Sequence, residues 1–310
     1  MLTVLQTALE VGLIYGLVAL ALFISFSILN IADLSTDGCF TLGCAVGAML
    51  TIAGHPILAL FAAMAAGMLS GYITAFLQTR LGVESILAGI ISNTGLYTIN
   101  LAVMGFSSNV SITGVETVFS LFKGLVGGQW SRLILLALIA AVIVLVLIRF
   151  FGTSLGLSIR ATGDSLDMVS ASSINPKATI TIGLCLANAL TALSGCLIGE
   201  YNKFCDINLG TGMVTIALAS LIIGEVFAGR RGSVGKRVVC VVLGSIVYRF
   251  IIALALRLNI SAEYFKLVSA VIVAVAIAAP NMKDYVHLAK IKSNARKLRA
   301  LSGKGDETDA

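Results

Sequence analysis

The stretch Gly152–Lys177, GTSLGLSIRATGDSLDMVSASSINPK, is a polar segment between two long apolar runs. Its small and polar residues predict a short helix within a loop. We expect Gly163 to interrupt the structure that precedes it and Asp164 to cap the backbone N–H groups of the short helix that follows. The Asp167 carboxylate would then lie in the first turn, near the positive end of that helix. Pro176 then ends the segment before the next apolar run. The residue spacing in this segment, taken alone, favours an ordinary cytoplasmic loop that connects the two apolar runs.

The composition around this segment is that of an integral membrane protein. Hydrophobic residues make up 58% of the 310 residues, charged residues make up 12%, and the mean hydropathy is +1.02. Charged residues are about a quarter of a typical soluble domain. The 3 prolines and 7% aromatic residues favour helices over the alternating strands of a barrel. We therefore expect an all-α fold, a polytopic transmembrane helical bundle of about eight to ten spans.

The apolar runs predict one transmembrane domain over residues 1–282, followed by a basic cytoplasmic tail over 283–310. The second run is short, and the polar residues before it predict a broken span near residues 30–54. The mixed stretch 107–131 predicts a partly interfacial helix, because its Trp130 favours that depth. The runs are Leu9–Leu29, Cys39–Ala53, Ile57–Leu77, Ser85–Phe106, Leu133–Ile148, Ala178–Gly199, Leu209–Ala228, Val238–Leu256 and Leu267–Ala279.

Charges in the short loops predict the orientation. A basic cluster between the seventh and eighth runs places that loop in the cytoplasm, and parity places residues 152–177 and the tail on the same side. The cluster is Arg230, Arg231, Lys236 and Arg237. We therefore interpret the net charge of +6 as topological and expect no nucleic-acid partner.

The cysteines lack metal-ligand spacing and fall mostly inside apolar runs, so we expect small buried thiols. They are Cys39, Cys44, Cys185, Cys196, Cys205 and Cys240.

Polar side chains inside apolar runs are costly and therefore informative. For Glu225 and Arg249 we favour a structural role, in an inter-helix ion pair or reaching toward headgroups or the basic loop. A wall of the transport route is the alternative. Asparagines in spans, including Asn100, are weaker candidates because an amide can simply bond a neighbouring helix. The candidates for a translocation pathway are Asn30, Asp33, Asp37, Asn93 and Asn188.

Part of the central segment resembles the coupling loop of ABC-transporter permeases of the branched-chain amino acid and ribose type. The matching stretches are Ser158-Ile159-Arg160-Ala161-Thr162-Gly163-Asp164, then Asp167-Met168, then Ile174-Asn175. In that family the loop is a short cytoplasmic helix that sits in a groove of the ATP-binding subunit. The chain departs from relatives at Ser165-Leu166, where they usually carry Asn-Pro, and at Ser172-Ser173, where they carry a bulky apolar residue and Gly. The resemblance implies ATPase coupling through Arg160, Ala161, Thr162, Gly163, Asp164, Leu166, Asp167, Met168, Ile174 and Asn175.

A second resemblance points to one branch of the same family. It is carried by Phe26–Gly38 (FSILNIADLSTDG), by Ile222-Ile223-Gly224-Glu225-Val226 and by Ala187-Asn188. This branch is usually described as a tryptophan/tyrosine-type transport system that works with a lipoprotein-like binding protein. The resemblance covers roughly residues 8–282.

This family implies a permease subunit of an ATP-driven importer in the bacterial plasma membrane. The solute would be small, an aromatic or other amino acid among the candidates. The implied partners are a second permease subunit in a homodimer, two ATP-binding subunits and an external solute-binding protein.

Other functions fit the sequence less well. The chain has no G-x-x-x-x-G-K-[ST] phosphate loop, so we expect no ATPase, catalytic residue, metal or cofactor of its own, with ATP bound by the partner subunit. An ion-gradient-driven secondary transporter is the alternative, although no paired halves are evident. An intramembrane enzyme comes third, because His55 and His287 lie outside any metal or catalytic cluster.

Overall fold

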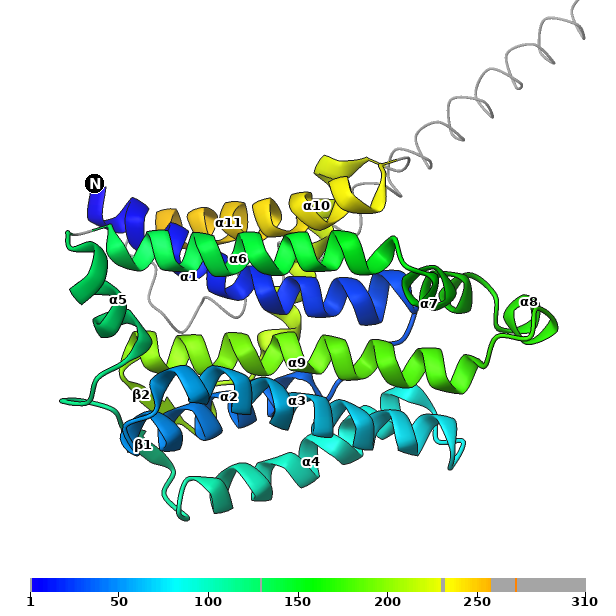
Figure 1. Cartoon of the computed structure of the whole chain (residues 1–310), viewed down its shortest axis with the longest axis horizontal. Coiled ribbons are helices and arrows are strands. Elements are labelled where there is room, and N and C mark those ends of the chain that lie inside the picture. Colours follow the sequence, from blue (N-terminus) through cyan, green and yellow to red (C-terminus); the bar gives the residue numbers. More distant parts are fainter. Residues whose placement is uncertain (1, 129, 230–231, 258–270, 272–310) are drawn as a thin grey trace, which may run out of the picture.

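The computed structural model describes residues 2–128, 130–229, 232–257 and 271, which form a helical bundle (Figure 1). Within these residues, six helices are long and apolar enough to cross a membrane, and two shorter apolar helices lie among them. The expected all-α polytopic bundle is therefore confirmed. The tail 283–310 and, apart from residue 271, the ninth run Leu267–Ala279 lie outside the described residues.

The helices begin and end close to the expected runs. Pro56 and Pro176 each occupy the first turn of a helix, where a missing N–H costs nothing. The elements are α1 (Leu2–Leu22), the π-helix η1 (Phe23–Ile28), α2 (Thr36–Ile52), α3 (Pro56–Thr79), α4 (Ser85–Val103), β1 (Asn109–Ser111), α5 (Val118–Val126), α6 (Ser131–Phe151), α7 (Ser154–Asp164), α8 (Leu166–Ala171), α9 (Pro176–Asn202), β2 (Phe204–Asp206), α10 (Met213–Ala228) and α11 (Val234–Arg257).

The bundle has two distinct ends (Figure 1). At one, which we call the α7–α8 end, those two helices extend past the rest of the bundle. At the other, the sheet end, β1 pairs antiparallel with β2, with Val110 opposite Cys205. The start of α1 and helix α5 also lie at the sheet end. The helix α5 confirms the helix expected within residues 107–131.

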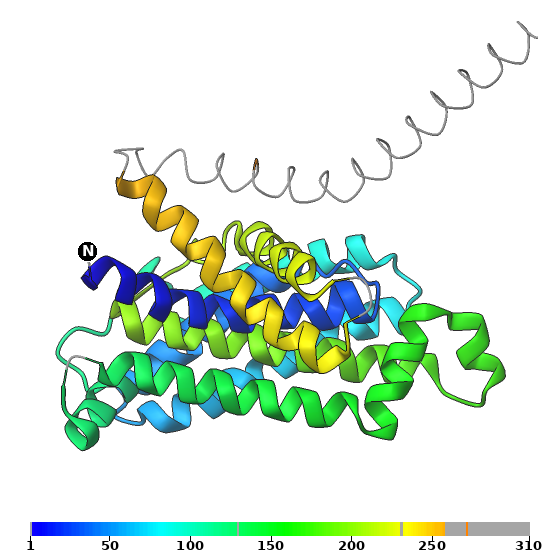
Figure 2. The same cartoon turned by 90° about the horizontal axis from the view of Figure 1, so that it is seen from above.

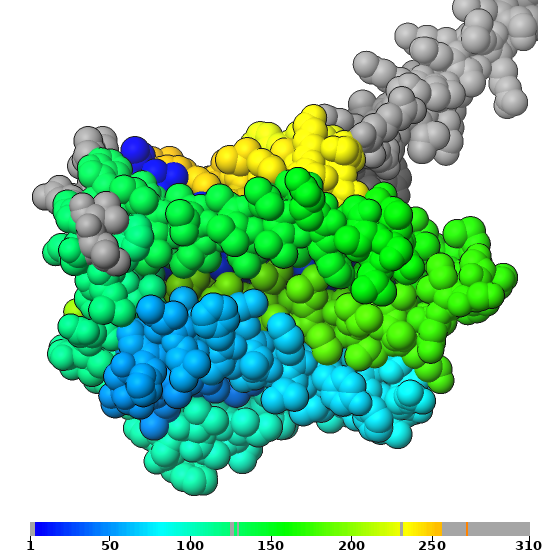
Figure 3. All heavy atoms as spheres, viewed as in Figure 1, coloured from blue at the N-terminus to red at the C-terminus, as the bar shows by residue number. Residues whose placement is uncertain are grey.

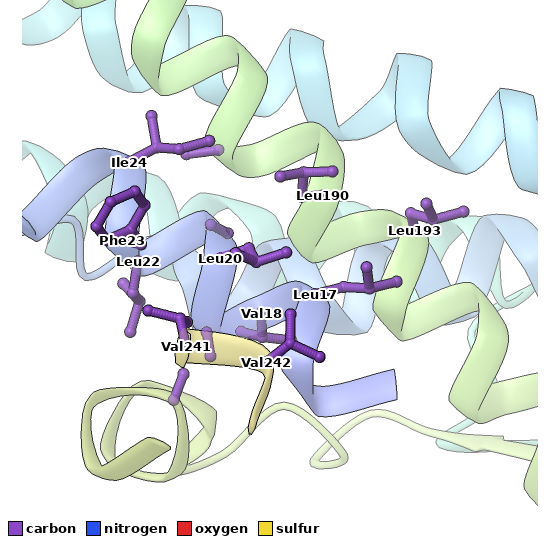
Figure 4. Packing of buried hydrophobic residues seen from close by; sticks show 14 of the residues in the cluster. Leu17, Val18, Leu20, Leu22, Phe23, Ile24, Leu190, Leu193, Val241 and Val242 are labelled. Atoms are coloured by element: carbon purple, nitrogen blue, oxygen red, sulfur yellow. The ribbon is translucent and has the colours of Figure 1, made fainter. Parts of the chain in front are cut away.

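The helices α1 and α9 form the centre of the bundle. In the apolar windows of these two spans, 72% and 83% of residues are buried, against 22% in α6. Figure 4 shows α1 side chains such as Leu17 and Leu20 between Leu190 of α9 and Val242 of α11. Because lipid is as apolar as leucine, such spans are held together by close packing. The peripheral helix α6 turns most of its surface outward.

Small residues permit the closest contacts between these helices. A Cβ added to Gly43 in α2 would overlap Ala192 in α9, and one added to Gly195 in α9 would overlap Phe40 in α2. The two helices therefore approach each other backbone to backbone. Five of the six cysteines are buried and Cys185 is half-buried, which confirms the burial expected of them.

An arrangement of one long, one short and one long helix occurs twice. The first set is α1 with η1, α2 and α3, and the second is α9, α10 and α11. In each set the third helix packs antiparallel against the long helix of the other set, with Gly67 of α3 against Asn188 of α9 and Gly12 of α1 against Ile246 of α11. Figure 2 shows α11 crossing over α1. These paired halves are not evident in the sequence.

Candidate functional site

The first candidate region is the break between α1 and α2. The wide π turn leaves Leu29 N donating to Ile24 O at 3.0 Å and Ile31 N donating to Ser25 O at 2.9 Å. Residues 29–35 then run without regular helix beside α9. Non-helical backbone at such a depth must be covered by protein or water, and π turns occur often at functional sites. The structure confirms the broken span and places the break at residues 29–35.

A buried polar cluster lies on this break. Asp33, which is 3% exposed, accepts hydrogen bonds through Oδ1 from Ser35 N at 2.9 Å and Ser35 Oγ at 2.6 Å. Its Oδ2 accepts from Asn188 Nδ2 at 2.8 Å. Asn188 also donates to Leu184 O, at 3.1 Å. Two of the predicted pathway residues, Asp33 and Asn188, therefore come together and fix the broken segment to α9.

Asp37 joins the two short helices. Its Oδ2 accepts from Gly212 N and its Oδ1 from Val214 N, both at 2.9 Å. These N–H groups belong to the start of α10, where a carboxylate also interacts favourably with the helix dipole. The side chain on α2 thus caps α10 across the bundle.

We expect Asp37→Ala to destabilise the folded chain by about 1–2 kcal/mol, because both N–H groups lose their acceptor. Asp37→Asn retains one acceptor oxygen and should fall between the alanine variant and the wild type. Thermal unfolding of the detergent-purified chain measures this order. Equal melting temperatures for all three proteins would show that the cap does not stabilise α10.

A cavity of about 330 Å³ lies beside Asp37, between the start of α2, helix α4 and the segment before α10. The predicted residues Asp37 and Asn93 line it. Asp33 and Asn188 are not among its lining residues, and neither is Asn30, which is exposed at the break with a φ of +57°. The other lining residues are Gly38, Thr41, Thr94, Tyr97, Asn100, Ile207, Asn208 and Thr211.

Sequence reasoning found only part of this lining. Asn93, Tyr97 and Asn100 are four and three residues apart, which places them on one face of α4. From that spacing, a shared polar face on α4 could have been predicted. Asn208 and Thr211 lie in an irregular segment and carry no comparable signal.

The segment 152–177 forms two helices and the start of α9. The expected break at Gly163 is wrong, because α7 runs through it to Asp164. The expected cap at Asp164 is also wrong, because Ser165 Oγ accepts from Met168 N at 3.3 Å and begins α8. Ser165 outcompetes Asp164 because it already has an extended backbone at the junction between the two helices.

The α7–α8 segment is largely exposed, and Figure 3 shows it projecting from the bundle. Leu166 and Met168 are 53% and 57% exposed. Thr162 is buried, and its hydroxyl shares a hydrogen bond of 2.8 Å with Thr179 of α9. Of the other residues implied in coupling, Arg160, Ala161, Gly163 and Ile174 are half-buried, and Asp164, Asp167 and Asn175 are exposed.

Helix α7 lies directly against the π turn. A Cβ added to Gly163 would overlap Ile28 O and would lie 3.0 Å from Leu29 Cα. Only glycine allows this approach of one backbone to another. A displacement of α7 would therefore act first on η1 and on the broken segment that follows it.

The two intramembrane charges do not pair with each other. Glu225 forms an ion pair with Arg237, in which Arg237 Nη2 lies 2.6 Å from Glu225 Oε1. Glu225 Oε1 also accepts a hydrogen bond from Ser27 Oγ. This cluster joins α10, α11 and η1 at the α7–α8 end. Arg249 instead places its guanidinium carbon 4.0 Å from the ring centroid of Tyr15.

Comparisons with known proteins agree with this architecture. Residues 4–277 match the family described as "Branched-chain amino acid transport system / permease component". The chain is 30% identical to the tyrosine transport system permease protein of Clostridioides difficile (strain R20291) over 294 residues, which are 94% of this chain and 95% of that protein. It is 31% identical to an uncharacterized protein of Rickettsia prowazekii (strain Madrid E) over 284 residues, 91% of this chain and 99% of that one. No solved structure matches the chain significantly. The chain therefore belongs to the family of permease components of branched-chain amino acid transport systems.

Proposed function

We propose that this chain is the membrane subunit of an ATP-driven importer for an amino acid. A separate ATP-binding subunit docks on the α7–α8 end, an external binding protein delivers the solute at the sheet end, and a second copy of the chain completes the pathway. The tyrosine transport permease relative supports an amino acid as the solute.

The observation that carries this proposal is the form of the α7–α8 segment. The segment projects from an apolar bundle and carries exposed charges, and its apolar side chains Leu166 and Met168 are also exposed. Exposed apolar residues outside the hydrocarbon suit a protein partner rather than water. Through Gly163 and η1 the same segment contacts the broken span, so movement of the partner can reach the interior.

The charge distribution supports an inward-facing α7–α8 end. Basic residues cluster at that end of the bundle, as they do on the cytoplasmic side of membrane proteins. Those among the described residues are Arg80, Arg149, Arg160, Lys177, Lys236 and Arg237.

The cavity beside Asp37 is the proposed part of the solute route. Its amide and hydroxyl groups can exchange hydrogen bonds with a passing polar solute, and it adjoins the starts of the two short helices. Interrupted helices near solute sites are common in transporters.

Copurification from detergent tests the docking surface. The neighbouring ATP-binding subunit is coexpressed with the chain. The double variant Arg160→Ala with Asp164→Ala should reduce the amount of copurified ATP-binding subunit about tenfold or more relative to the wild type, because a few central contacts carry most of the binding energy of an interface. Arg80→Ala with Glu84→Ala is the matched control, since it also removes one basic and one acidic side chain at the α7–α8 end. Equal retention by both double variants would contradict the assignment of the docking surface.

The paired halves keep a secondary transporter as the second candidate, because such repeats are typical of that class. Uptake into proteoliposomes separates the two. The importer hypothesis requires uptake that depends on both the ATP-binding subunit and ATP. Uptake driven by a proton or sodium gradient without that subunit would favour the secondary transporter.

A further inference from the structure

Two adjoining cavities lie at the sheet end, under α5 and between α1, α6 and α9. Their volumes are about 160 Å³ and about 310 Å³, and both are lined by Lys123, Arg132 and Tyr201. The smaller one reaches Glu200 and the larger one reaches Glu10. We call the two together the outer pocket. None of its lining residues belongs to the cavity beside Asp37.

The floor of the outer pocket carries two buried carboxylates. Glu10 is 3% exposed and accepts from Gln6 Nε2 and from Tyr201 Oη, each at 2.9 Å. Glu200 is 1% exposed and accepts from Thr51 Oγ1 at 3.1 Å and from Val118 N at 2.8 Å. A carboxylate has about four acceptor positions, so each can accept further donors. Buried carboxylates in a span are costly and usually functional.

The rim of the outer pocket carries the opposite charge beside aromatic rings. Arg132 and Lys123 are exposed, and the Arg132 guanidinium carbon lies 5.8 Å from the ring centroid of Tyr201. The rings of Tyr201 and Phe119 meet edge to face, with centroids 6.0 Å apart. Both signs of charge and an apolar aromatic surface therefore face one small space.

This pattern fits a free amino acid better than a simple ion. An inorganic anion would meet the buried carboxylates, and an inorganic cation would meet Arg132 and Lys123. A zwitterion satisfies both sets at once. The larger cavity is at the small end of ligand pockets, which suits one amino acid rather than a peptide.

We propose that the outer pocket is a solute-binding site that receives a free amino acid before it enters the bundle. Arg132 and Lys123 bind the carboxylate, Glu10 binds the ammonium group, and Tyr201 and Phe119 pack against an aromatic side chain. This assignment rests on the proposed transport function and adds a specific site to it.

Equilibrium binding to the full chain in lipid nanodiscs tests the site, with radiolabelled L-tyrosine as the probe. L-tyrosine amide lacks the carboxylate and N-acetyl-L-tyrosine lacks the ammonium group. Each should compete at least about tenfold less well than L-tyrosine, since each loses charged hydrogen bonds. L-leucine should compete more weakly than L-tyrosine because it has no ring.

Variants connect this selectivity to the named residues. Arg132→Gln should weaken L-tyrosine binding at least about tenfold while leaving binding of the amide unchanged. Glu10→Gln should remove the discrimination against the N-acetyl compound. Arg80→Gln is the matched control at the opposite end and should bind like the wild type. Arg132→Lys keeps the charge and should bind better than Arg132→Gln, which separates ligand contact from a folding defect.

Several results would overturn the proposal. These are no saturable L-tyrosine binding, equal binding of the three tyrosine compounds, or an Arg132→Gln variant that behaves like Arg80→Gln. The proposed transport function is judged separately by ATPase copurification and ATP-dependent uptake. If ATP-dependent uptake persists although the outer pocket does not discriminate among the three tyrosine compounds, the proposed binding site is refuted and the importer function still stands.

Discussion

Gly163→Ala is expected to uncouple the α7–α8 segment from the interior of the bundle. The added methyl group would overlap Ile28 O, and backbone atoms of η1 cannot rotate aside as a side chain could. Helix α7 must then shift away from the π turn. Overpacking of this kind costs about 1–3 kcal/mol or more, so the melting temperature should fall. ATP-driven uptake should be lost even where the ATP-binding subunit still copurifies.

The matched control for this prediction is Gly95→Ala. Gly95 also lies within a helix, α4, and nothing lies within 4 Å of the position of an added Cβ. Alanine there should leave uptake intact and stabilise the helix by up to about 1 kcal/mol. Melting by fluorescence-detected size exclusion and uptake into proteoliposomes provide the two measurements. If the two variants behaved alike in both, the contact between α7 and η1 would not transmit coupling.

Asn188→Asp is expected to destabilise the bundle severely. It replaces the amide that donates to Asp33 by a second carboxylate, at a position that is 1% exposed. Leaving a buried charge without its partner costs about 3–5 kcal/mol. Little monodisperse protein should therefore be recovered from membranes.

Combining Asn188→Asp with Asp33→Asn should restore much of this loss. The exchanged pair again contains one carboxylate and one amide, and the amide oxygen at position 33 can still accept from Ser35. Asn175→Asp is the control, because Asn175 is an exposed cap of α9 and Asp caps equally well. Recovery and melting temperature of the three variants form the test. A double variant no better than Asn188→Asp would exclude this pair as the anchor of the break.

The sequence predicted the parts of the fold that depend on local composition. Apolar runs located the helices, and the polar stretch between Asn30 and Gly38 located the break, because hydropathy alone limits what can face lipid. It also singled out Asp33, Asp37 and Asn188. It did not predict the contacts of Asp33 with Asn188 or of Asp37 with Gly212, since each joins residues more than 150 positions apart.

Gly163 shows where local reasoning fails. Propensity marks a glycine as a helix breaker, yet here the helix continues and the missing Cβ serves a contact with a distant segment. The two sets of long, short and long helices are likewise a product of tertiary packing. The ion pair of Glu225 with Arg237 is different, because an inter-helix ion pair was one of the arrangements expected for Glu225 from the sequence. Of the cavity residues that were missed, Tyr97 could have been identified from its spacing to Asn93 and Asn100.

The bond between Asp33 and Asn188 has a consequence for biosynthesis. The two residues are 155 positions apart, so at 5–20 residues per second the ribosome needs roughly 8 to 30 s to make the second after the first. During that interval the nascent chain carries a carboxylate bound for the membrane interior without its amide donor. Because an unpaired carboxylate is costly in hydrocarbon, we expect the break between α1 and α2 to stay near the aqueous boundary, or to be sheltered by an insertase, until α9 emerges.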